Sequence, residues 1–275
     1  MNKTGAQLLL MILLSSGAAW AEDCKFSSER AAKFNGPVKK VVVSADAGSL
    51  KIHGDTNGEL KALGKACASS ENLLGKIGLE SRRENDTVYL TVVLGSSMTD
   101  MFSFKRYAYL DLDIAVPRNV ELEVTDSSGD LELSDVGTTR VTDGSGDQLL
   151  KNINGNLYVN DSSGVIRIMS VIGDVEVEDS SDNIDIEDVR GNVRILSDSS
   201  GDIAIAKVTG NVDVMDDSSG DITIREVKQN VKIHNDSSGD INVSDVGGNF
   251  AVMVDSSGNI LYERVSGTVR IPAGN

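Results

Sequence analysis

Apolar and polar residues alternate along this chain in short runs, and after about residue 125 the runs return at a regular interval. The interval that starts at position 198 has five apolar positions in two groups: Ile203, Ile205, Val208, Val212 and Val214. Alternation with a period of two is typical of β-strands that bury one face. Each interval therefore predicts two short strands whose five apolar side chains point inward.

A corner of sequence Asp-Ser-Ser-Gly precedes each interval. Full copies start at positions 126, 161, 198, 217, 236 and 255, with variants at 143 and 179. Successive corners are thus roughly 17–19 residues apart, and a fixed period of this kind is the signature of a solenoid in which each repeat stacks on the next. We expect the glycines to adopt positive φ and the serine hydroxyls to form a ladder between repeats. The corner positions of three repeats are Ser199, Ser218, Ser237, Gly201, Gly220 and Gly239.

The predicted fold is all-β, a right-handed parallel β-helix or β-solenoid with two short strands in each rung of roughly 17–19 residues. Gly210-Asn211 marks the second turn of one rung. Residues 125–275 are expected to form this regular solenoid.

The chain before the repeats also alternates, but without the regular corner. Residues 46–49 resemble a degenerate corner between two strands, and a short helix is expected after Ser70, a good helix cap. We expect residues 38–124 to form an N-terminal β region that contains early degenerate rungs and caps the core. Residues 22–37 are expected to form an N-terminal strap.

Residues 1–21 have the pattern of a secretory signal. Lys3 supplies a positive charge, residues 8–14 a short apolar run, and Ala19-Trp20-Ala21 a cleavage site of the A-x-A type. We expect residues 1–21 to be removed and the mature protein to be exported, to the periplasm or the cell surface. No later apolar run is long enough to predict a membrane span.

The chain has only two cysteines, Cys24 and Cys67. In an oxidising compartment an even pair is most simply a disulfide. The formal net charge of −16 argues against a nucleic acid partner, because binding to phosphates needs clustered Lys and Arg. An acidic chain is compatible instead with divalent cations or a basic partner.

The later rungs contain one more residue than the earlier ones, at a position where four side chains are expected to stack in a column. These residues are Leu196, Met215, His234 and Met253. The preferred interpretation is that they fill a widened corner of the core, since Leu and Met are usually core residues. The alternative is an exposed stripe that docks a partner.

Stacked corners would also align acidic residues. One expected column runs from Asp126 to Asp255, and the second contains Asp130, Asp147, Asp202, Asp221 and Asp240. The preferred interpretation is structural, with each Asp accepting hydrogen bonds from the amides of its own turn. The alternative is a row of Ca²⁺ ions bound by carboxylate and hydroxyl oxygens. Candidate ligands are Asp198, Asp217, Asp236, Asp255, Asp202, Asp221 and Asp240.

A catalytic role is the less favoured interpretation. Rungs this short leave no long loops in which to build a cleft, and neither His53 nor His234 has a recognisable partner by spacing. The segment from Met98 to Tyr109 is the best place for a site, although it can equally cover the end of the core. We expect no catalytic residue and no cofactor other than Ca²⁺.

Several motifs resemble the DUF4097 family of exported bacterial proteins, whose members often carry the label adhesin. They are the run from Asp113 to Pro117, the run from Val124 to Asp130, and the later copies of Gly-Asp-Ile-x-Ile-x-x-Val-x-Gly-Asn-Val. The resemblance extends from about residue 38 to the end. It implies a β-solenoid without established enzymatic activity.

The sequence therefore favours a non-enzymatic structural or adhesin-like binding module of the cell envelope. A Ca²⁺-binding solenoid and a polysaccharide-active β-helix enzyme are the alternatives. The expected partner is an envelope protein or a glycan, and the expected state is a monomer or weak self-association.

Overall fold

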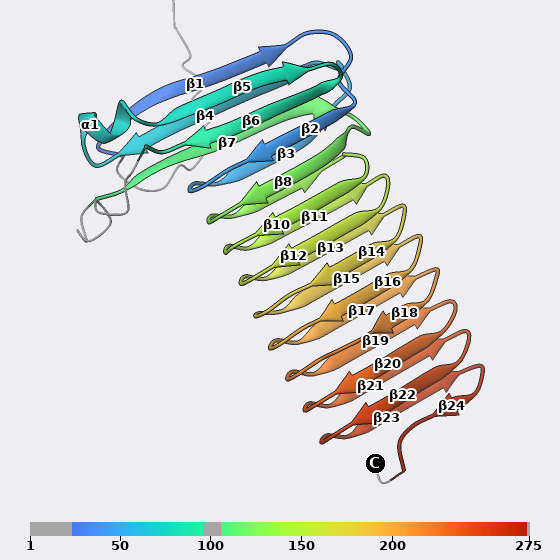
Figure 1. Ribbon diagram of the computed structural model, residues 1–275. Coiled ribbons are helices and arrows are strands. Elements are labelled where there is room, and N and C mark those ends of the chain that lie inside the picture. Colours follow the sequence, from blue (N-terminus) through green and yellow to red (C-terminus); the bar gives the residue numbers. More distant parts are fainter. Residues whose placement is uncertain (1–23, 96–105, 274–275) are drawn as a thin grey trace, which may run out of the picture.

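The computed structural model describes residues 24–95 and 106–273, and the chain forms a two-sheet solenoid with an antiparallel cap at its N-terminal end (Figure 1). The expected signal peptide, and residues 98–105 of the segment singled out as a possible site, lie outside the described residues. The predicted β-solenoid with two strands in each rung is confirmed.

Each sheet contains twelve strands. Sheet A has the spatial order β1 (Phe26–Phe34), β4 (Leu60–Ala68), β7 (Ala108–Pro117), β3 (Leu50–Asp55), β9 (Leu131–Ser134), β11 (Gln148–Ile153), β13 (Ile166–Val171), β15 (Ile184–Val189), β17 (Ile203–Val208), β19 (Ile222–Val227), β21 (Ile241–Val246) and β23 (Ile260–Val265). Sheet B has the order β24 (Val269–Arg270), β22 (Phe250–Asp255), β20 (Val231–Asp236), β18 (Val212–Val214), β16 (Val193–Ser197), β14 (Val175–Glu178), β12 (Leu157–Asp161), β10 (Thr139–Asp143), β8 (Glu121–Asp126), β2 (Lys40–Ser44), β6 (Thr87–Val93) and β5 (Gly78–Glu84).

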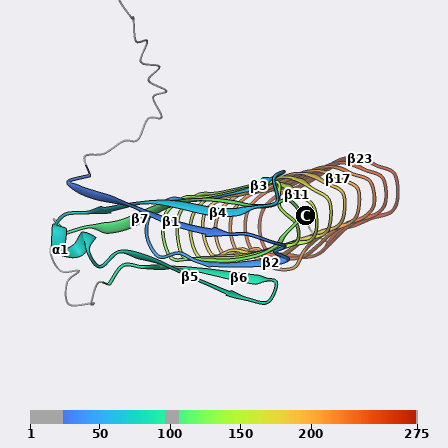
Figure 2. The same ribbon diagram turned by 90° about the horizontal axis from the view of Figure 1, so that it is seen from above.

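Successive rungs pair in parallel and in register, so that like residues form columns. Ile203 lies opposite Ile222, which lies opposite Ile241. The five predicted inward positions of the rung after residue 198 are each at most 1% exposed. Because neither strand of a rung can bury its apolar face alone, the stacked columns are the core. Viewed from above, the rungs overlap as a series of similar loops, each displaced a little from the one before (Figure 2).

The extra residue of the later rungs appears first as a β-bulge. Val177 of β14 pairs with Ile195 of β16, but Glu178 pairs with Ser197, which leaves Leu196 without a counterpart. The insertion is therefore where the lengthening of the repeat predicts it.

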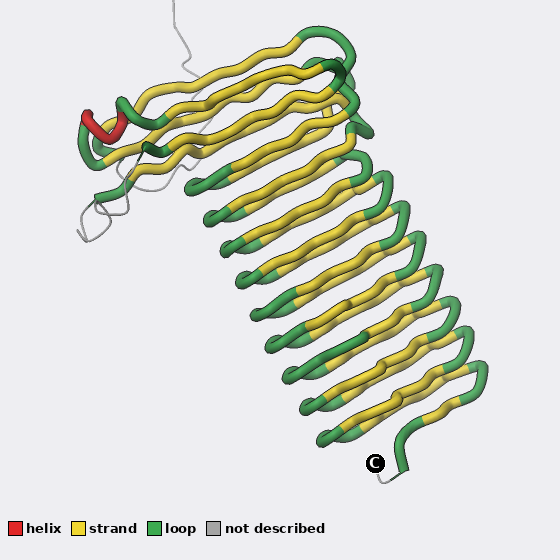
Figure 3. Tube along the Cα trace, viewed as in Figure 1, coloured by secondary structure: helices red, strands yellow, loops and turns green. Residues whose placement is uncertain are grey.

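The N-terminal region caps the solenoid by extending both sheets with longer strands (Figure 3). β2 and β3 are true rungs, because β2 pairs in parallel with β8 and β3 with β9. Their connection contains Gly48 with φ +116°, which confirms residues 46–49 as a degenerate corner. A four-residue helix, α1 (Glu71–Leu74), follows Ser70, whose side chain accepts a hydrogen bond from the Leu73 amide.

Residues 22–37 are not merely a strap. Most of the segment is β1, a nine-residue strand that pairs with β4 in antiparallel fashion from Phe26 opposite Ala68 to Phe34 opposite Leu60. Its inward positions include Ser28 and Arg30, so the sequence lacks the full apolar alternation by which a strand is normally recognised.

The two ends of the solenoid differ. At the C-terminal end β23 and β24 are the last strands of their sheets, and Leu261 and Tyr262 of β23 are 59% and 47% exposed.

Among the described residues, no helix has the length and apolarity that a membrane crossing requires.

Candidate functional site

The Asp-Ser-Ser-Gly corners form a continuous ridge along the solenoid, held by backbone approach and serine hydroxyls. Gly220 has φ +128°, and a Cβ atom there would lie 1.8 Å from the carbonyl oxygen of Gly201 in the preceding rung. Only glycine permits this stacking. Ser219 Oγ donates to the Ser199 carbonyl at 3.2 Å, and Ser238 Oγ to the Ser218 carbonyl at 3.1 Å. The expected ladder therefore exists, but it runs from hydroxyl to backbone carbonyl.

The first serine and the glycine of each corner have the expected structural roles. Ser237 also offers its carbonyl to the next rung, since it accepts from Ser257 Oγ at 3.2 Å. Gly201 and Gly239 repeat the geometry of Gly220, with φ +127° and +134°.

The two acidic columns exist, and they differ in environment. The first Asp of each corner is buried from Asp126 to Asp236, with exposures of 0 to 3%, whereas Asp255 of the last corner is half-buried. The inner column consists of Asp126, Asp143, Asp161, Asp179, Asp198, Asp217 and Asp236.

The outer column is exposed and bonds from rung to rung. Asp202 Oδ1 accepts the Asp221 amide, Asp221 Oδ1 the Asp240 amide and Asp240 Oδ1 the Asn259 amide, each at 2.9 Å. Asp147 likewise accepts the Val165 amide at 3.1 Å, and Asp130 accepts the Asp147 amide at 3.3 Å. A carboxylate that accepts a hydrogen bond from a backbone amide of the next rung stabilises the stack, because that amide would otherwise lack a hydrogen-bond partner.

The seven candidate Ca²⁺ ligands do not converge. Asp198, Asp217 and Asp236 lie in the inner column with Asp255 at its end, and Asp202, Asp221 and Asp240 lie in the exposed outer column. The described part of the chain holds no group of three or more His, Cys, Asp or Glu residues that could hold a metal ion. Ca²⁺ takes six to eight oxygen ligands, which a single file of carboxylates does not supply.

The column at the inserted position does not fill the core. Leu196, Met215 and His234 are half-buried and Met253 is 49% exposed. A core-filling role for Leu196, Met215, His234 and Met253 is therefore wrong. Leu196 is the extra residue at the bulge between β14 and β16, and the other three occupy the same position of the later rungs, outside the buried columns. The partly exposed stripe is the interpretation that agrees with their burial.

The two cysteines form the predicted disulfide. Cys24 and Cys67 are bonded with their Cα atoms 5.6 Å apart, and the bridge joins the segment before β1 to β4. Its effect is to fasten the edge strand of the cap.

Each histidine has an acidic neighbour that spacing did not reveal. His53 Nδ1 lies 3.3 Å from Asp113 Oδ1 on β7, and His234 Nε2 lies 3.7 Å from Asp213 Oδ1 on β18. Both histidines are partly exposed on the outer faces of the sheets, where their neighbours come from adjacent strands.

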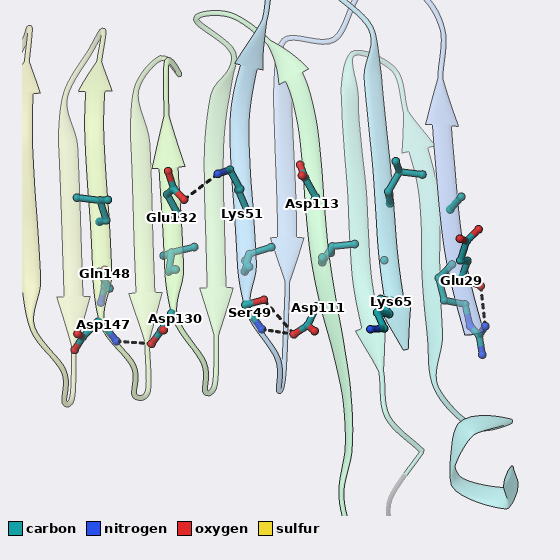
Figure 4. Close-up of a pocket in the computed structure, with 18 of the residues that line it drawn as sticks. Glu29, Ser49, Lys51, Lys65, Asp111, Asp113, Asp130, Glu132, Asp147 and Gln148 are labelled. Atoms are coloured by element: carbon teal, nitrogen blue, oxygen red, sulfur yellow. Dashed lines mark hydrogen bonds and ion pairs between the residues drawn. The ribbon is translucent and has the colours of Figure 1, made fainter. Parts of the chain in front are cut away.

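A large concavity, a groove of about 970 Å³, lies on the outer face of sheet A where the cap meets the solenoid. Seven strands, from β1 to β13, contribute to it. We call it the junction groove. Figure 4 shows its charged side chains in two rows across the strands, one with Glu132, Lys51 and Asp113 and the other with Asp147, Asp130 and Asp111.

Ion pairs and hydrogen bonds order the floor of the junction groove. Lys151 and Lys51 reach Glu132 from the two flanking strands, at 2.7 and 3.0 Å, and their hydrogen bonds hold the pKa of Glu132 below its usual range. Asp111 Oδ1 accepts from both the amide and the hydroxyl of Ser49 at 3.0 Å. Such a preordered polar surface can bind a charged ligand without first losing side-chain entropy.

The groove also has an apolar position. Leu63 of β4 is 48% exposed on the outer face, between acidic and basic side chains. Its lining contains six acidic residues and four basic ones, of which Arg30 belongs to the inward face of β1: Glu29, Asp111, Asp113, Asp130, Glu132 and Asp147, with Arg30, Lys51, Lys65 and Arg167. Among the described residues that line it, none is aromatic.

Sequence reasoning missed the junction groove because its residues face outward from strands that are not consecutive in the chain. β4 enters sheet A between β1 and β7 in antiparallel fashion, and the rungs begin only beyond β7. The one available signal was Leu63, an apolar residue at an outward position of a strand whose pattern was otherwise recognised.

A family model described as Toastrack DUF4097 matches residues 38–260. A crystal structure described as "Putative lipid binding protein", from Parabacteroides distasonis, has 17% identity and a TM-score of 0.54, with 88% of this chain and 96% of that chain covered. A structure described as "putative adhesin", from Parabacteroides merdae, has 13% identity and a TM-score of 0.48, with 90% and 96% covered. The comparison with curated proteins gave no significant match. The similarity to the first of these structures supports the β-solenoid fold.

Proposed function

The chain belongs to the Toastrack DUF4097 family, and from this premise we propose that it is a non-enzymatic, adhesin-like binding module exported to the cell envelope, with the junction groove as its binding surface. The observation that carries the proposal is the groove itself, which is large, preordered and built where the cap meets the solenoid. Its volume is in the range of natural ligand sites.

The lining favours a segment of another protein as the ligand. Positive and negative side chains alternate around Leu63, so a chain with both charges and an apolar anchor would match it. A glycan is less favoured because sugars are usually held by stacking on aromatic rings, and the described lining has none. An acyl chain is less favoured because acidic and basic residues surround the exposed Leu63.

Export is supported by the disulfide, since structural disulfides persist in oxidising compartments. The pattern of a secretory signal in residues 1–21 agrees with it. The protein would then meet its partner in the periplasm or at the cell surface.

The test is capture of partners from an envelope extract by immobilised protein, with Leu63→Glu as the groove variant. Leu261→Glu is the matched control, because Leu261 is also an exposed leucine of sheet A but lies on β23 at the far end. We expect Leu63→Glu to reduce retention of the captured protein at least about tenfold, roughly the loss of one well-placed interface side chain. Leu261→Glu should bind like the wild type.

Equal retention by the wild type and Leu63→Glu would contradict the proposal. Binding of the wild type to phospholipid vesicles, lost in Leu63→Glu, would instead assign the groove to a lipid.

A further inference from the structure

The inner acidic column is a stack of buried carboxyl groups in register. Asp143 lies opposite both Asp126 and Asp161, and Asp217 lies opposite both Asp198 and Asp236. Strands of a sheet are about 4.8 Å apart, so each carboxyl group inside the column has another directly above and below it. Burial at this spacing is unusual, because like charges repel more strongly away from water.

Backbone amides of the turns donate hydrogen bonds to at most one of the two carboxyl oxygens of each Asp in the column. Asp126 Oδ1 accepts the Ser127 amide at 2.8 Å, and Asp179 Oδ1 accepts the Ser180 amide at 2.7 Å. The second oxygen, Oδ2, is buried without a hydrogen-bond partner among the described residues at all seven positions of the inner column, and at Asp217 the same holds for Oδ1. An unpaired buried carboxylate oxygen is strongly destabilising, so these atoms call for a partner.

The surroundings offer no opposite charge. Each charged group that acts on the inner column is itself acidic, and besides members of the column these groups are Asp46, Asp182, Asp202, Asp221 and Asp255. The side chain of Gln148 also acts on Asp161, but it is neutral. Within the described ranges, none of the seven carboxyl groups forms an ion pair with Lys, Arg or His. Among the described residues no side chain balances this charge, and a small cation would both balance the charge and pair with the buried oxygens.

A proton fits this site better than a metal ion. Each gap between rungs presents two facing carboxyl groups, whereas Ca²⁺ needs six to eight oxygens and Mg²⁺ six. A proton needs only a donor and an acceptor oxygen, and a hydrogen bond from a carboxylic acid to a carboxylate is short and strong.

We propose that protons are the ligands of the inner column. Aspartic acids alternate with aspartates in the folded protein at neutral pH, and each acid donates its O–H to the Oδ2 atom of a neighbouring rung. Every shared proton removes one buried charge and gives a hydrogen-bond partner to two carboxyl oxygens, one that donates and one that accepts. The column then titrates as a unit.

The electrostatics of the column agree with the proposal. Burial raises the pKa of Asp217 to about 7, and repulsion from Asp198 and Asp236 adds to the rise. Burial likewise raises the pKa of Asp126 and Asp179 to about 7 and that of Asp143, Asp198 and Asp236 to about 6. In the unfolded chain these groups titrate near pH 4.

The folded state therefore binds more protons than the unfolded state between about pH 4 and pH 7. Since the free energy of unfolding falls with pH wherever the folded state holds the extra protons, this contribution is full below about pH 4 and is lost as pH rises through 6 to 7. The protein should be more stable in mild acid than in mild base.

The experiment follows thermal unfolding of the purified protein from pH 5 to pH 8.5 in EDTA, for the wild type, Asp217→Asn and Asp240→Asn. We expect the wild-type midpoint to fall by at least about 5 °C over this range, a shift that a chain of this size shows readily. Asp217→Asn should raise the midpoint at pH 8.5 and flatten the profile, because its amide donates without a titrating proton.

Asp240→Asn is the matched control. It removes the same charge from the outer column, at a residue that does not act on the pKa of the inner Asp residues. Asn can still accept the Asn259 amide that Asp240 accepts. Its profile should follow that of the wild type. The infrared band of protonated carboxylic acid should also be present in the folded wild type at pH 7, a measurement that stands even if Asp217→Asn does not fold.

Two results would overturn the proposal. One is a wild-type midpoint that does not fall between pH 5 and pH 8.5 together with no carboxylic acid band at pH 7. The other is a midpoint at pH 7 that rises when Ca²⁺ replaces EDTA and an infrared spectrum that shows carboxylates alone, since metal ions would then be the partners.

Discussion

Individual backbone conformations decide how the rungs of this protein stack. At one corner of each regular rung the chain passes so close to its neighbour that a Cβ atom has no room, as at Gly220. Near the end of the strands of sheet A the left-handed conformation is adopted by residues other than glycine, among them Lys207 of β17 with φ +58° and Glu226 of β19 with φ +58°. That conformation turns the strand so that Val208 and Val227, three positions after the preceding inward residue, also point into the core.

Replacement of Gly220 by Ala should destabilise the protein strongly. The new Cβ atom would meet the Gly201 carbonyl oxygen at 1.8 Å in a backbone conformation that disfavours side chains. Because both obstacles are backbone, the rungs must move apart, and we expect a loss of about 3–5 kcal/mol in the free energy of unfolding. Denaturant unfolding measures it.

Gly58→Ala is the control for this prediction. Gly58 also has positive φ, +69°, but nothing lies within 4 Å of its Cβ position. Only the backbone strain of about 1 kcal/mol should remain. Equal losses for the two variants would show that close approach between rungs is not what selects glycine at the corner.

The inward residues could be predicted from the sequence, and the left-handed positions only in part. Val and Ile at alternating positions mark a buried face whatever the details of the turn. Lys207 and Glu226, by contrast, are residue types that rarely adopt positive φ. Asn152, Asp188 and Asp245 at the equivalent positions of other rungs are types that favour positive φ, so the sequence carries a signal in some rungs and none in those of Lys207 and Glu226.

At the level of elements, the cap depends on a strand that its own sequence specifies weakly. β1 lies at the edge of sheet A, and part of its inward face is polar: Arg30 Nε donates to the Ile77 carbonyl at 2.8 Å and its second terminal nitrogen to the Leu74 carbonyl at 3.2 Å. A segment held in this way gains most from a covalent link. The Cys24–Cys67 disulfide supplies that link.

Loss of the disulfide should therefore affect the cap and spare the rungs. The bridge spans 43 residues of sequence, and the chain-entropy model gives it about 4 kcal/mol. In the Cys24→Ser, Cys67→Ser double variant we expect faster amide hydrogen exchange in β1 and β4. Amides of β17 and β19 should keep their protection, since a rung contacts only its neighbours.

Uniform loss of protection across both regions would contradict this expectation, because it would mean that the cap and the solenoid unfold as one unit. The sequence did not predict β1, and the cause is the same feature that makes this strand depend on the disulfide. It places Ser28 and Arg30 at inward positions where a typical strand has apolar residues.

For the whole molecule, in-register pairing implies that the solenoid can change length only by complete rungs. Deletion of positions 217–235 removes one complete rung and joins Asp216 to the next corner at Asp236. Every column then keeps its register, so we expect a folded protein with one rung fewer, shorter by about 4.8 Å. Circular dichroism and a cooperative thermal transition would verify it.

Deletion of positions 217–225 is the comparison. It removes about half a rung and brings a strand of one sheet into the position of a strand of the other sheet. Inward-facing residues would then no longer align with inward-facing residues of the neighbouring rungs. We expect this variant to lose the cooperative transition. A folded half-rung variant would show that register along the solenoid is not strictly required.

The solenoid could be predicted from the sequence at this scale and the junction groove could not. A fixed repeat defines a stack regardless of its surroundings. The groove arises from the order of strands in sheet A, where β4 and β7 separate β1 from the first rung at β3. That order depends on the long-range antiparallel pairing of β4 with β1 and β7, which the repeat pattern does not predict.

The direction of the hydrogen bonds between rungs has a mechanical consequence. They run along the axis of the solenoid, from β17 to β19 to β21 and onward. A force that pulls the C-terminal end away from the cap would therefore load one pair of strands at a time and peel the rungs in sequence. Each rung would release up to about 65 Å of extended chain, so that the protein would lengthen stepwise under tension while its bridged cap stayed folded.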